Sequence, residues 1–100
     1  MADAEPRVTT LAASTLGGPG VPDPRRCSDN AMAVLGEAAG ADMRMASLSL
    51  DVTSHLLEER AVEVVVRVDK RARSIVFASA EARSGGKLVY SAQGLFSRAG

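Results

Sequence analysis

The chain has 100 residues, and its twelve basic and twelve acidic side chains give it no net charge. This length favours one domain with a small core, which is often marginally stable alone, so we expect self-association. Zero net charge and only three aromatic residues argue against a nucleic-acid partner and against an anionic membrane surface.

The cysteine content and the hydropathy of the sequence indicate the cellular compartment in which we expect the protein. The single Cys27 excludes an intrachain disulfide and fits a reducing compartment. No apolar run reaches the length of a membrane span, so we expect no membrane partner. The acidic start of the sequence lacks the features of a secretory signal. A cytoplasmic location is therefore the expectation. No cluster of histidine and cysteine indicates a metal site, and no cofactor is expected.

The first quarter of the chain is rich in residues that interrupt secondary structure. Residues 16–24 contain repeated glycine and proline, which neither a helix nor a central strand tolerates. Only residues 8–11 could form a short edge strand. We therefore divide the chain into a flexible N-terminal segment, residues 1–26, and a folded domain, residues 27–100.

A helix is predicted over residues 29–40. Ser28 and Asp29 are favourable N-cap residues, and Gly40 is a plausible C-cap. Apolar residues of this segment occupy almost every side of the helix, which predicts that the helix is buried. Its many alanines would let a sheet approach closely.

Four strands are predicted after the helix, over residues 47–52, 61–68, 74–83 and 87–97. Apolar and polar residues alternate in the first of these, which is the period of a half-buried strand. Gly85 and Gly86 favour a tight hairpin, because glycine accepts positive φ. Small residues gather on the last two strands, and we interpret them as the face on which the helix packs: Ala78, Ala80, Ala82, Ala92 and Gly94. The expected class is α+β.

This pattern resembles the hotdog-fold thioesterases over about residues 28–97. The order of helix, strand, long connection, strand, turn, strand, glycine hairpin and strand is that of the family, and residues 61–96 look like its closing strands. The resemblance implies one central helix wrapped by a curved antiparallel sheet. It also implies a homodimer or homotetramer, with acyl-CoA or another acyl thioester bound at the dimer interface.

The resemblance also assigns a candidate site. One branch of the family opens its helix with His-Gly-Gly and carries a catalytic carboxylate nine residues after the histidine. Laid on this sequence, the carboxylate falls on Glu37, which implies a general base or nucleophile. The His-Gly-Gly positions fall on Ser28, Asp29 and Asn30, which become candidate substrate-binding residues through their backbone N–H groups. The alternatives are a Glu37 that reaches solvent or pairs with an arginine, and three residues that only cap the helix.

The sequence therefore leads to two hypotheses for the function. The first is hydrolysis of an acyl thioester with Glu37. The second is a non-catalytic hotdog module that binds an acyl ligand or serves in assembly. A hydratase on the same fold would need a pair of histidine and acid, and the single His55 more readily fits a solvated loop residue. Basic residues near the turns could meet CoA phosphates or simply face solvent: Arg25, Arg26, Lys70, Arg71 and Arg73.

Overall fold

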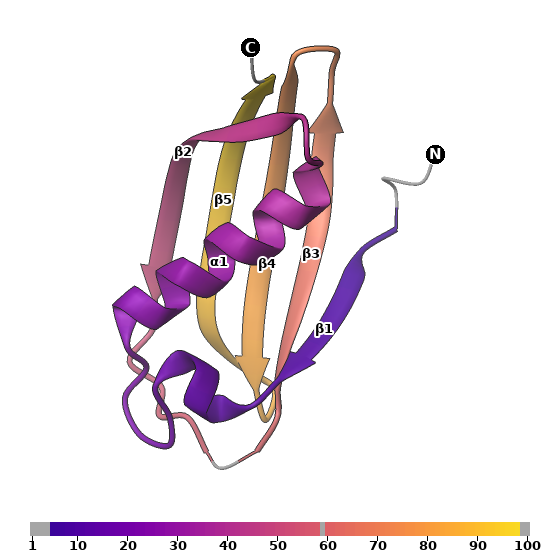
Figure 1. Ribbon diagram of the computed structural model, residues 1–100. Helices are drawn as coiled ribbons and strands as arrows, with labels where there is room; N and C mark the ends of the chain where they lie inside the picture. The colour runs from indigo at the N-terminus through magenta and orange to yellow at the C-terminus, as the bar shows by residue number, and fades with distance from the viewer. Residues whose placement is uncertain (1–4, 59, 99–100) are drawn as a thin grey trace.

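The structure is a computed structural model that describes residues 5–58 and 60–98. A short strand, β1 (Arg7–Leu11), and a 3-10 helix, η2 (Ala13–Leu16), precede the α-helix, α1 (Pro24–Ala39). Four longer strands follow: β2 (Met43–Val52), β3 (Val62–Arg71), β4 (Ile75–Ser84) and β5 (Lys87–Arg98). Figure 1 shows α1 lying across the sheet that these strands form.

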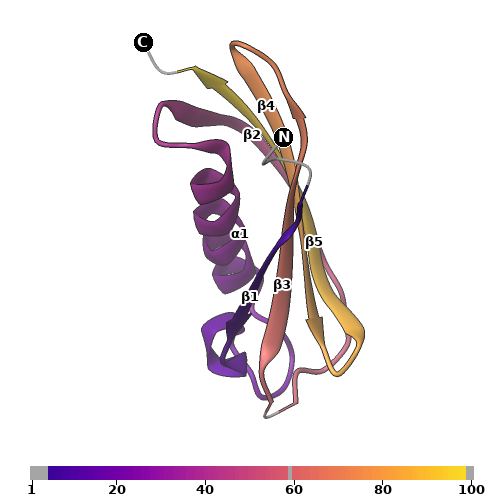
Figure 2. The same cartoon turned by 90° about the vertical axis from the view of Figure 1, so that its right-hand side faces the viewer.

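The described strands form one antiparallel sheet in the order β1-β3-β4-β5-β2. Figure 2 shows that α1 covers one face of this curved sheet and leaves the opposite face open. The predicted α+β class, with one helix against a curved antiparallel sheet, is confirmed. No helix among the described residues has both the length and the apolar character to cross a membrane.

The helix packs closely because the facing side chains are small. In register, Ala78 pairs with Gly94, and Ala80 pairs with Ala92, on the face that α1 covers. A Cβ at Gly94 would lie 3.3 Å from the Leu35 side chain on α1 and 2.9 Å from the Phe96 ring. These distances leave little room for a larger residue, so the predicted role of the small residues is confirmed.

The helix begins earlier than the sequence pattern predicts, at Pro24. Asp23 is the N-cap, and its side chain accepts a hydrogen bond from the backbone N–H of Arg25 at 2.9 Å. The predicted caps Ser28 and Asp29 were wrong, because proline suits the first helical position, where its missing N–H costs nothing. The predicted C-cap is confirmed, since the Gly40 N–H donates to the Gly36 carbonyl.

The segment before α1 has more structure than its composition suggested. The predicted edge strand is confirmed as β1, which pairs with β3. Leu16 in η2 is fully buried, and the backbones of Gly20 and Leu57 exchange two hydrogen bonds, at 2.9 and 2.7 Å. The domain boundary drawn at residue 26 falls within α1. The observed packing thus joins this segment to the same core as the strands.

Replacing Leu16 with alanine tests whether this packing matters. Removing a fully buried leucine should lower the free energy of unfolding by about 2–5 kcal/mol. Leu56→Ala is the matched control, because Leu56 is 64% exposed and the change should stay within about 0.5 kcal/mol. Urea denaturation measures both. Equal, small effects would mean that the N-terminal segment adds little to stability.

Candidate functional site

Glu37 lies in the last turn of α1 and points to solvent. Its side chain is 82% exposed, and its Oε1 atom lies 3.8 Å from Nη1 of Arg7 on β1, itself 62% exposed. Exposed ion pairs of this kind contribute little to stability, about 0–1 kcal/mol. The structure thus leaves the Glu37 carboxylate accessible and only weakly held.

The three residues at the His-Gly-Gly positions lie inside α1 rather than at its start. Since the helix begins at Pro24, the backbone N–H groups of Ser28, Asp29 and Asn30 are positioned for intrahelical hydrogen bonds. They are therefore not the free donors that we expected for binding a carbonyl oxygen. Any hydrogen bond that these three residues donate to a substrate must therefore come from their side chains.

Those side chains differ in their surroundings. Ser28 is half-buried, and its hydroxyl makes only a weak contact of 3.8 Å with the sulfur of Met32. Asp29 is exposed. Asn30 is half-buried, and its Oδ1 atom accepts a hydrogen bond of 2.6 Å from the Tyr90 hydroxyl. This bond fixes the amide so that its Nδ2 group remains available as a donor.

Asn30 belongs to a polar cluster between the helix and the sheet that the sequence did not reveal. Tyr90 is fully buried on β5, and its burial raises the pKa of the phenol above its ordinary value. Cys27 is also fully buried, and desolvation, assisted by the charge of Asp23, raises the pKa of its thiol to about 11. Both groups are neutral at pH 7, so Cys27 supplies no thiolate that could act as a nucleophile.

His55 has a structural position at the end of the β2 strand. Its Nδ1 atom lies 3.2 Å from the Leu88 carbonyl, which also accepts a 2.7 Å hydrogen bond from the Thr53 hydroxyl. A carbonyl can only accept, so Nδ1 carries the proton. His55 thus ties the connection after β2 to β5, in an exposed place.

The basic residues near the β3–β4 turn are divided between the two faces of the sheet. Arg71 donates to the carbonyls of Ala38 and Ala39 at 3.1 and 3.0 Å, which caps the C-terminal end of α1. Lys70 pairs in register with Phe77 on the opposite face. Lys70 and Arg71 therefore do not form a single binding site for the phosphates of CoA. The described residues also contain no group of three acidic, histidine or cysteine side chains placed to bind a metal.

Alkaline unfolding tests the burial of the Cys27 thiol. The folded protein keeps this proton up to about pH 11, whereas the unfolded thiol loses it near its ordinary pKa of 9.0. The unfolded state then binds fewer protons, so the free energy of unfolding should fall as the pH rises from 9 to 11, by about 2–3 kcal/mol. Urea titrations across this range should show a shallower fall for Cys27→Ala. An identical slope would contradict the assignment.

Comparison with known proteins supports the fold. No protein-family model matches the sequence, and no curated protein matches it. Solved structures do match. The PaaI protein of Escherichia coli, from the phenylacetic acid degradation operon, is 15% identical with a TM-score of 0.75, covering 95% of this chain and 72% of its own. Zebra fish thioesterase superfamily member 2 is 13% identical with a TM-score of 0.80, covering 99% and 78%.

A third structure adds a ligand to the comparison. A hypothetical thioesterase of Streptococcus pneumoniae, solved with coenzyme A, is 14% identical with a TM-score of 0.74, covering 93% of this chain and 76% of its own. Identities this low establish the shared architecture rather than a shared activity. The resemblance seen in the sequence is confirmed at that level: this chain has the hotdog fold of the thioesterase superfamily proteins.

Proposed function

We propose that this protein hydrolyses an acyl thioester such as an acyl-CoA, as a cytoplasmic homodimer or homotetramer. The observation that carries the proposal is the accessible Glu37 carboxylate on the central helix of a hotdog fold, and the sequence resemblance assigns the family's acid to this residue. The fold neighbours described as thioesterases, one of them with coenzyme A, support the substrate class.

Hydrolysis of a thioester requires two groups from the protein: a carboxylate, and a hydrogen-bond donor to the carbonyl oxygen of the thioester. Glu37 takes a proton from water, whose oxygen attacks the thioester carbonyl carbon, or it attacks that carbon itself. The tetrahedral intermediate then expels the thiolate, which is protonated to the free thiol. Where Glu37 itself attacks, this step leaves a mixed anhydride between Glu37 and the acyl group, and water then hydrolyses it and regenerates the Glu37 carboxylate. The products of either route are the carboxylic acid and CoA. The Asn30 Nδ2 group is our candidate donor to the carbonyl oxygen, with Ser28 and Asp29 beside it as candidate contacts to the rest of the substrate.

The resemblance to the hotdog-fold thioesterases implies a site at a dimer interface, to which two chains contribute. Asn30 and Glu37 are two turns apart on α1, which separates them by about 10 Å along the axis. Groups that act on one carbonyl must each approach to about 3 Å. Glu37 of one copy and Asn30 of another could reach these distances from the same thioester at that interface. The open edge of β2, at the end of the described sheet, is where we expect the two copies to join.

A non-catalytic hotdog module is the second candidate. The polar trio Ser28, Asp29 and Asn30 replaces His-Gly-Gly and lies within α1, which removes the backbone donors at that position. The Arg7–Glu37 ion pair could likewise have only a surface role. In this alternative the protein binds an acyl ligand or serves in assembly without turnover.

Replacing Glu37 with glutamine separates the two candidates. The purified protein is tested against acyl-CoAs of varied chain length, with released thiol as the readout. Glutamine keeps the shape and removes the acid, so turnover should fall by about a hundredfold or more. Glu63→Gln, which neutralises an exposed carboxylate on β3, should retain activity.

Both variants should sediment as the parent does, with no folded monomer at micromolar concentration. Full activity in Glu37→Gln would show that another group is the base. A parent protein that cleaves no thioester would leave the non-catalytic module as the function, and a stable compact monomer would contradict the two-chain site.

A further inference from the structure

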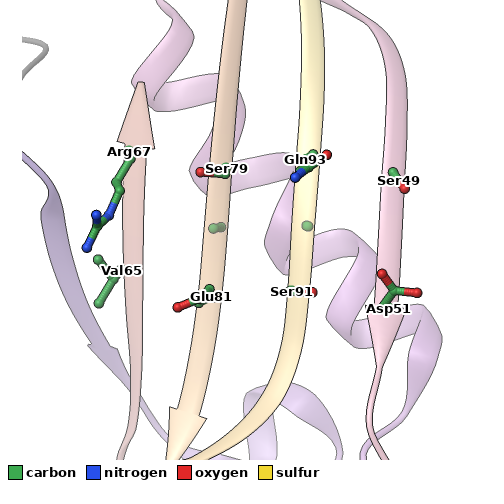
Figure 3. Close-up of a pocket in the computed structure, with 10 residues that line it drawn as sticks. Ser49, Asp51, Val65, Arg67, Ser79, Glu81, Ser91 and Gln93 are labelled. Atoms are coloured by element: carbon green, nitrogen blue, oxygen red, sulfur yellow. The ribbon is translucent and has the colours of Figure 1, made fainter. Parts of the chain in front are cut away.

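Tyr90 places a polar group on the face of the sheet that α1 covers. Its neighbours Ser91 and Gln93 on β5 point to the opposite face, where they line a hollow of about 470 Å³ (Figure 3). Tyr90 is fully buried on the helix side, and its register partners are Ala82 on β4 and Val52 on β2. The phenol ring therefore stands among apolar side chains, and its hydroxyl needs a hydrogen-bond partner from α1.

Asn30 is that partner, and the distance indicates which end of its amide meets the phenol. The Tyr90 hydroxyl donates a hydrogen bond to Oδ1 of Asn30 at 2.6 Å. This length is usual for O–H···O bonds, which span about 2.5–3.0 Å, and short for N–H···O bonds, which span about 2.7–3.2 Å. A buried phenol without this bond would keep an unsatisfied polar group. The bond therefore holds the Asn30 amide in one orientation.

The orientation of the amide decides what Asn30 can bind. With Oδ1 against the phenol, the Nδ2 group is directed away from it, and its two hydrogens are donors. Asn30 is half-buried, between the buried Ala31 and the exposed Asp29, so its side chain lies at the edge of the contact between helix and sheet. Donors at this edge fit a hydrogen-bond acceptor such as the carbonyl oxygen of a thioester. A rotated amide would present Oδ1 instead, with which a carbonyl oxygen cannot form a hydrogen bond.

We propose that Tyr90 is a positioning residue for the Asn30 amide, so that this site selects a ligand with a carbonyl oxygen and stabilises that oxygen during turnover. The inference rests on the proposed hydrolysis of an acyl thioester. Tyr90 itself is fully buried and acts only through Asn30. Because the bond joins α1 to β5, the donor is in place before the substrate binds. Preorganised donors of this kind stabilise the negative charge that develops on the carbonyl oxygen when the carbonyl carbon is attacked.

A double-mutant cycle tests the coupling of Tyr90 to Asn30. Asn30→Ala removes the donor, so kcat should fall by about a hundredfold or more while KM changes little. Tyr90→Phe removes only the hydroxyl and lets the amide rotate, so kcat should fall by about tenfold. In the Asn30→Ala background, Tyr90→Phe should have no further effect on kcat, since no amide is left to position. An unchanged kcat in Tyr90→Phe, or an equal fall in both backgrounds, would overturn the proposal.

Thr53→Val is the matched control for a lost hydroxyl. The Thr53 hydroxyl donates a 2.7 Å hydrogen bond to the Leu88 carbonyl, in a place that is also partly buried. Its removal should lower the stability in urea much as Tyr90→Phe does, because each change deletes one hydrogen bond. It should leave kcat unchanged. If kcat fell in Thr53→Val as far as in Tyr90→Phe, general destabilisation would explain both results and the proposal would be wrong.

A second readout does not depend on turnover. Asn30 is the only asparagine of the chain, so protein labelled with ¹⁵N-asparagine gives one pair of side-chain N–H signals in an NMR spectrum. The amide should be rigid in the parent protein and mobile in Tyr90→Phe.

The same signals report ligand binding. In Glu37→Gln, which should not cleave the ligand, they should shift on addition of the acyl-CoA that the parent cleaves fastest, or of butyryl-CoA if it cleaves none, but not of CoA alone. A mobile amide in the parent, or signals that the acyl-CoA leaves unmoved, would overturn the inference even for an active thioesterase. A parent without turnover that still gives both results would contradict only the proposed hydrolysis.

Discussion

The close approach of α1 to the sheet is the constraint on which the other features depend. It is possible because the strands beneath the helix carry alanine and glycine, with Ala80 opposite Ala92 and Ala78 opposite Gly94. Leu35 then fills the space that these small residues leave, in contact distance of Gly94. Apolar burial of this kind is the main favourable term in folding, and in a chain of 100 residues few other contacts can replace it.

This packing decides which groups remain available for function. The buried side of α1 packs on the sheet, so Glu37 is left on the solvent side, where its carboxylate lies 3.8 Å from the Arg7 guanidinium. The two groups with strongly raised pKa values are part of the core: Cys27 lies on the buried side of α1, and Tyr90 lies on β5. The β2 edge and the outer sheet face have no partner among the described elements (Figure 2).

Local patterns in the sequence predicted the parts of the fold that depend on local chemistry. Alternating residues marked the strands, Gly40 marked the end of the helix, and the small residues marked the helix-packing face. The start of α1 was missed because Pro24 is both a helix breaker and a good first residue, and only the Asp23 cap decides between them. The hydrogen bond from Tyr90 to Asn30 joins residues far apart in sequence, so no local pattern reveals it. The exposure of Glu37 likewise depends on which side of the helix meets the sheet.

The most direct test of the close approach is to enlarge a residue beneath the helix. Ala80 is 1% exposed, and Ala80→Leu would push α1 away from the sheet. Urea denaturation should show a loss of about 1–3 kcal/mol in the free energy of unfolding. Arg83→Leu, an exposed change on the same strand, should alter it by no more than about 0.5 kcal/mol. An unchanged free energy for Ala80→Leu would contradict the account, since it would mean that the helix does not depend on the small residues below it.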